Sequence, residues 1–83
     1  MAKYLTFHVE PDRRWEDLVE KYRTLARETT ATWVRTYIFE DGGRRICEWD
    51  APSPETLHVI FERTGVSCDQ ISPVRQVLPD QWR

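Results

Sequence analysis

The sequence lacks any long apolar run, and its first residues, MAKYLTFHVE, lack the apolar core of a signal peptide. A helix that spans a bilayer needs roughly 18 or more apolar residues in succession. No stretch of this chain approaches that length. We therefore expect a cytoplasmic protein with no membrane partner.

The chain also has no excess of positive charge. Twelve Lys and Arg stand against 14 Asp and Glu, which gives a net charge of −2. A protein that holds a phosphate backbone depends on an extended positive field, and none arises here. Nucleic acid is therefore excluded as an expected partner.

Cysteine is scarce, with two residues in 83, Cys47 and Cys68. They fall in different predicted elements and match no CxxC spacing. In a reducing compartment such cysteines are most simply free thiols. Cys47 lies among residues predicted to face the core, where a thiol is usually an inert, small hydrophobic group.

The chain does contain enough apolar material to fold. Hydrophobic residues make up 40% and aromatic residues 12% of the sequence, which is too apolar for charge-driven disorder. A length of 83 residues supports one domain, residues 1–83. A domain this small buries a modest share of its surface, so a homodimer is expected from size alone.

Six elements can be predicted along the chain. KYLTFHVE alternates apolar and polar residues with the period of a strand, and an amphipathic helix follows to residue 26, with Asp12 as its predicted cap. TWVRTYIFE and RRICEWDA are predicted to form a hairpin with a two-residue turn. Ser53, Pro54 and Gly65 predict a second helix over 54–64, and QISPVRQVL predicts a last strand.

The order β-α-β-β-α-β is that of an α+β, ferredoxin-like fold. It has a four-stranded antiparallel sheet, in the spatial order 4-1-3-2, with two helices on one face. Proline belongs on an edge strand because it cannot donate to the ladder. Pro73 falls on the fourth strand, which this order places at an edge.

Alternation assigns side chains to the two faces of this sheet. The more apolar set of the first strand, Leu5, Phe7 and Val9, is expected to face the helices. The other face is then unusually aromatic and should be covered, most simply by the sheet of a second copy. Its expected residues are Tyr4, His8, Trp33, Arg35, Tyr37, Phe39, Ile46, Glu48 and Asp50.

A compact polar cluster is expected within this face. His8 and Glu48 lie on neighbouring strands and are predicted to bind a divalent metal, since imidazole and carboxylate suit Ni, Zn or Fe. The predicted ligand-binding residues are Trp33, Arg35, Tyr37, Glu48 and Asp50. A cross-strand ion pair between Arg35 and an acid is the simpler explanation of part of this cluster. His58 lies off the apolar stripe of its helix and is expected in solvent.

Several short pieces are similar to a known family. They are WVRTY, Cys47 followed by APSPE, Gly65, and the closing I..V..V. On these pieces the chain resembles the nickel-binding-protein-like family of small bacterial ferredoxin-like domains. The resemblance implies a dimer that pairs through its sheets and a nickel-like metal ligand. Members often have a histidine in the second helix where this chain has Ile60.

Two other functions remain open at this stage. A cofactor-free enzyme of the dimeric α+β barrel type, an isomerase or oxygenase, would use His8 as base and Arg35 with Tyr37 to stabilise an oxyanion. That hypothesis rests on analogy between folds. A purely structural or interaction module is the third reading.

Overall fold

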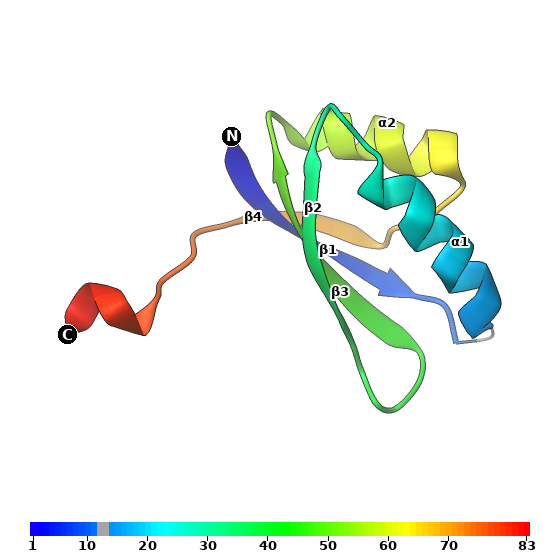
Figure 1. Cartoon of the computed structure of the whole chain (residues 1–83), viewed down its shortest axis with the longest axis horizontal. Coiled ribbons are helices and arrows are strands. Elements are labelled where there is room, and N and C mark those ends of the chain that lie inside the picture. Colours follow the sequence, from blue (N-terminus) through cyan, green and yellow to red (C-terminus); the bar gives the residue numbers. More distant parts are fainter. Residues whose placement is uncertain (12–13) are drawn as a thin grey trace.

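The computed structural model describes residues 1–11 and 14–83, and its elements follow the predicted order. Asp12, the predicted cap of the first helix, lies outside the described residues. Of the described residues, no helix has the length and apolar character to cross a bilayer. The elements are β1 (Ala2–Val9), α1 (Trp15–Ala26), β2 (Thr32–Ile38), β3 (Arg44–Ala51), α2 (Pro54–Thr64), β4 (Gln70–Val74) and the 3-10 helix η1 (Pro79–Trp82), as Figure 1 shows.

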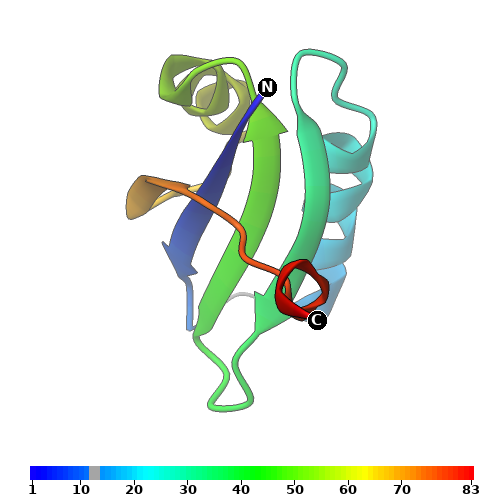
Figure 2. The same cartoon turned by 90° about the vertical axis from the view of Figure 1, so that its left-hand side faces the viewer.

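The four strands form one antiparallel sheet in the order β2-β3-β1-β4. This is the predicted order 4-1-3-2 read from the opposite edge, and Pro73 lies on the edge strand β4 as expected. Both helices cover the same face of the sheet, as Figures 1 and 2 show. We call the uncovered side the open face. The ferredoxin-like prediction is confirmed.

Helix α2 begins and ends where local chemistry requires it. The hydroxyl of Ser53 accepts a hydrogen bond from the backbone N–H of Thr56 at 3.3 Å, and Pro54 fills the first position. Gly65 ends the helix with φ +71°, a left-handed conformation that a side chain would strain. The second helix was therefore predicted correctly from its signals alone.

The hairpin between β2 and β3 has a longer loop than predicted. The N–H of Phe39 donates to the carbonyl of Arg44 at 2.9 Å, which leaves residues 40–43 as the loop. Four loop residues instead of two correct the predicted length, but both numbers are even. The pairing of Arg35 with Glu48 and of Tyr37 with Ile46 is therefore as expected.

The faces of β1 are the reverse of the prediction. Tyr4, Thr6 and His8 are buried beneath the helices, whereas Leu5 and Phe7 are half-buried on the open face. The reason is the pairing with β3, which sets Tyr4 opposite Trp49 and Thr6 opposite Cys47. Paired residues share a face, so the fully buried Trp49 and its neighbours decided the orientation of β1. Trp49 belongs to a buried core that also contains Ala51, Leu57, Ile60 and Phe61.

Trp33 also lies on the other side from its predicted position. The register of β2 against β3 shifts between Trp33 and Arg35, so that Trp33 pairs with Trp49. Such a bulge adds one residue to a strand and changes which face the flanking side chains occupy. Trp33 therefore points toward the helices and stacks on Tyr22 of α1, with ring centroids 5.2 Å apart.

The last strand is shorter than QISPVRQVL suggested, because β4 ends at Val74. We call the segment that follows, residues 75–83, the C-terminal arm. Figures 1 and 2 show that it leads away from the sheet on the side opposite the helices, and it includes η1. Its three large apolar side chains are exposed: Val77 by 59%, Leu78 by 47% and Trp82 by 78%.

Candidate functional site

A charge cluster occupies the centre of the open face. The guanidinium of Arg35 lies 3.2 Å from Glu48, which confirms the predicted cross-strand pair. Lys3 joins Glu48 at 2.5 Å and Asp50 at 3.0 Å, so two cations face two carboxylates. The pKa of Lys3 is raised by its hydrogen bonds, first to Glu48 and then to Asp50. The cluster is a neutral network in which each carboxylate already has a cation.

Lys3 was absent from the predicted site. Its position opposite Asp50 in the β1–β3 ladder explains its role. The signal was present in the sequence, because the correct facing of β1 puts Lys3 on the same side as Leu5 and Phe7. The predicted facing of β1 turned Leu5 and Phe7 toward the helices, and by the same alternation it left Lys3 out of the open face.

Apolar side chains surround this charge cluster. Leu5, Phe7 and Ile46 are half-buried on the open face, and Tyr37 beside them is 61% exposed. Toward the hairpin, a shallow hollow of about 160 Å³ is lined in part by Phe7, Val9, Phe39, Arg44 and Ile46. The guanidinium of Arg44 lies 4.4 Å from the centre of the Phe39 ring. The open face carries aromatic side chains, as expected, but Phe7 lies there in place of Tyr4 and Trp33.

His8 lies on the opposite side of the sheet, beneath the helices. Its Nδ1 is 2.7 Å from the carbonyl oxygen of Ser67, which can only accept, so Nδ1 carries the proton. Nε2, at 2.8 Å from the hydroxyl of Thr6, is then the acceptor. The ring also packs edge-on against Phe61, with centroids 5.3 Å apart. Burial lowers the pKa of His8, so the ring is held neutral.

The predicted metal pair of His8 and Glu48 is therefore wrong for this chain. His8 is on the helix side and Glu48 is on the open face, separated by the sheet itself. The proposed catalytic group fails for the same reason, because Arg35 and Tyr37 share the open face and His8 does not. Of the predicted ligand-binding residues, Arg35, Tyr37, Glu48 and Asp50 lie on one face, and Trp33 does not.

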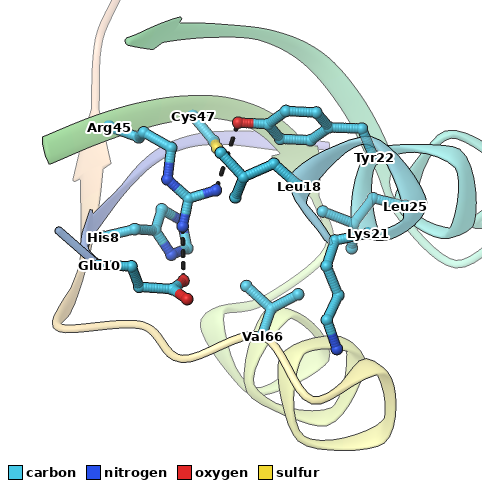
Figure 3. Close-up of a pocket in the computed structure, with 9 residues that line it drawn as sticks. All are labelled: His8, Glu10, Leu18, Lys21, Tyr22, Leu25, Arg45, Cys47 and Val66. Carbon is cyan, nitrogen blue, oxygen red and sulfur yellow. Dashed lines mark hydrogen bonds and ion pairs between the residues drawn. The ribbon is translucent and has the colours of Figure 1, made fainter. Parts of the chain in front are cut away.

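A second polar cluster lies next to His8, and sequence patterns gave no sign of it. Arg45 is 6% exposed and reaches Glu10 at 2.5 Å and the hydroxyl of Tyr22 at 3.3 Å. Figure 3 shows its guanidinium between these two side chains. The neighbouring cavity has room for water in only about 10 Å³, the lower limit for a single molecule. This cluster is a packed polar interior and has no space for a substrate.

Cys47 is core, as predicted. It is 3% exposed and accepts a hydrogen bond from the hydroxyl of Thr36 at 3.0 Å. Burial raises the pKa of the Cys47 thiol, which disfavours the nucleophilic thiolate. Cys68 is half-buried, and burial raises its pKa as well. Neither thiol is activated.

The residues that could ligate a metal are scattered within residues 1–11 and 14–83. No three His, Cys, Asp or Glu residues gather there in a way that could hold a metal ion. Both nitrogens of His8 have protein partners, and Glu48 and Asp50 are neutralised by cations.

Comparison with known proteins agrees with this fold. No curated protein matches the chain. The crystal structure of SCO4226 from Streptomyces coelicolor A3(2) superposes with a TM-score of 0.76, over 93% of this chain and 100% of that one. Sequence identity is 17%, so the likeness concerns the fold alone. The family model described as nickel responsive protein SCO4226-like matches residues 4–74, and the chain therefore belongs to that family.

Proposed function

We propose that this protein works as a homodimer joined through the open faces of its two sheets, and that its nickel response depends on that dimer. The observation that carries the proposal is the open face itself. It leaves Leu5, Phe7 and Ile46 only half-buried around a central charge cluster, whereas both helices lie on the other side of the sheet. Antiparallel sheets tolerate one wet face when that face is polar, and this one also presents the apolar side chains Leu5, Phe7 and Ile46.

Nickel binding is the finer part of the proposal. The family is described as nickel responsive, and one chain offers no set of three ligands among its described residues. A two-fold dimer through the open faces would supply four carboxylates, Glu48 and Asp50 from each copy. Oxygen ligands suit nickel less well than imidazole does. Nickel must also displace Lys3 and Arg35, because these cations already pair with the carboxylates. We therefore expect modest affinity that is lost with the dimer.

The two free cysteines also support a reducing, cytoplasmic location, which we include in the proposal. The enzyme hypothesis gains no such support. Its base would be His8, and that ring is sequestered by Thr6, Ser67 and Phe61.

The dimer can be tested with one substitution on each side of the molecule. Ile46→Lys puts a charge in the middle of the open face, and in a two-fold dimer it places like charges against each other. Val59→Lys is the matched control, because Val59 is a β-branched residue on α2 with 61% exposure. Light scattering should find dimers for wild type and Val59→Lys, and monomers for Ile46→Lys. A monomeric wild type, or a dimeric Ile46→Lys, would refute the interface.

Nickel binding is measured on the same untagged proteins by calorimetry and metal analysis. We expect binding by wild type and Val59→Lys, and none by Ile46→Lys. Asp50→Asn should weaken nickel binding at least tenfold without dissociating the dimer. If monomeric Ile46→Lys binds nickel like wild type, the ligands lie within one chain and this part of the proposal is wrong.

A further inference from the structure

The C-terminal arm is an apolar feature that the fold does not use. Its side chains Val77, Leu78 and Trp82 are exposed by 59%, 47% and 78%. The family model ends at residue 74, the last residue of β4, so the arm lies beyond the matched part. Isolated exposed apolar residues are ordinary, but three within six positions on a projecting segment need a partner surface.

The side-chain hydrogen bonds of the arm lie within the arm itself. The backbone N–H of Leu78 donates to the side chain of Gln81 at 3.1 Å, and Arg83 pairs with Asp80 at 2.8 Å. These bonds close the short η1 turn and leave Trp82 facing outward. Among the described residues, no hydrogen bond or ion pair joins this turn to the sheet or the helices.

The direction of the arm relates it to the proposed dimer. Figure 1 shows the arm leaving β4 and extending away from the sheet, on the side that the helices do not cover. Figure 2 looks onto that side and shows the arm in front of the open face. A second copy docked on the open face would therefore lie on the same side of the sheet as the arm, within its reach.

We propose that the arm of each copy packs against the open face of the second copy, with Trp82 in the hollow beside Phe39 and Leu78 on the apolar surface next to it. This inference rests on the homodimer proposed above. The hollow has about 160 Å³ of free space and an apolar lining that includes Phe7, Val9 and Ile46. That size suits one large apolar side chain. Arg44 at its rim adds a cation that can lie over an indole ring.

The first test measures the dimer dissociation constant by sedimentation. Leu78→Ser and Trp82→Ser should each raise it at least tenfold, since each removes an apolar side chain that the dimer buries. The matched controls are Val59→Ser and Trp15→Ser, whose side chains are 61% and 59% exposed on the helices. Both controls should leave the constant unchanged within twofold.

The second test reads the arm directly by tryptic cleavage after Arg75, followed by mass spectrometry. The arm of a monomer is open to the protease, so cleavage should be fast in monomeric Ile46→Lys and in dilute wild type. In wild type it should slow at least tenfold as the protein concentration passes through the dissociation constant. The full-length chain is used throughout.

The outcomes separate the two proposals. A wild type that stays monomeric at every concentration overturns both. A dimer whose dissociation constant is indifferent to Leu78→Ser and Trp82→Ser, and whose arm is cleaved as fast as in the monomer, overturns only the role of the arm. Protection of Arg75 in the Ile46→Lys monomer would place the arm on its own sheet and also overturn the inference.

Discussion

The neutral, buried imidazole of His8 should make the protein less stable as the pH falls below 7. Burial is the main cause of its lowered pKa, and the nearby charge of Arg45 lowers it further. The hydrogen bond to Ser67 and the charges of Glu10 and Asp69 oppose the shift without reversing it. Protonation is therefore easier in the unfolded chain than in the native protein.

The sign and size follow from linkage. A group whose native pKa is lowered binds its proton in the unfolded state first, so unfolding becomes easier as the pH drops through 6.5, the ordinary histidine value. The loss of unfolding free energy between pH 7 and pH 5 is at most about 2 kcal/mol, the limit for an imidazole that stays neutral in the native state. This is a large share of the roughly 5–10 kcal/mol that holds a small domain together.

Urea denaturation at pH 7, 6 and 5, at one fixed protein concentration, measures this loss. His8→Asn keeps a donor for the carbonyl of Ser67 and removes the titrating group. It should start about 2–3 kcal/mol less stable at pH 7, because the ring no longer packs on Phe61, and then change much less with pH. His58→Asn is the control, since His58 is exposed on α2. Equal slopes for wild type and His8→Asn would refute the buried neutral imidazole.

Three further predictions concern other sites. Cys47 should react with a thiol reagent only on unfolding, whereas half-buried Cys68 should react sooner; equal rates in the native state would contradict the burial of Cys47. Gly65→Ala should lower the free energy of unfolding by about 1 kcal/mol in urea titrations, because φ is +71°. Arg45→Met should cost on the order of 3 kcal/mol by breaking the buried pair with Glu10, and a loss under 1 kcal/mol would show that the pair is not buried in solution.

The parts of the fold that could be predicted are those set by local chemistry. Ser53, Pro54 and Gly65 fixed the ends of α2 because capping and left-handed geometry act over a few residues. The strand order followed from the element sequence, and Pro73 agreed with it. The even length of the hairpin loop also preserved the Arg35–Glu48 pair.

The parts that could not be predicted are set by pairing across the sheet. Strand β1 offers two candidate faces, and the more apolar one, with Leu5 and Phe7, is not the buried one. Its orientation is decided by register against β3, which a single strand does not encode. The bulge that turns Trp33 to the helices is equally invisible to a strict two-residue period. Both errors fell on the candidate site: the facing of β1 separates His8 from Glu48, and the bulge removes Trp33 from the open face.

The inverted facing of β1 is itself an argument about assembly. A lone copy buries Thr6, His8 and Arg45, which must be hydrogen-bonded to avoid a penalty, and leaves Leu5, Phe7 and Ile46 half in water. With the opposite facing of β1, Leu5 and Phe7 would lie beneath the helices in place of Tyr4 and Thr6. With the observed facing, Leu5 and Phe7 become fully buried only when another surface covers the open face. In the proposed dimer that surface is the open face of a second copy, so the state of assembly is the first property to measure.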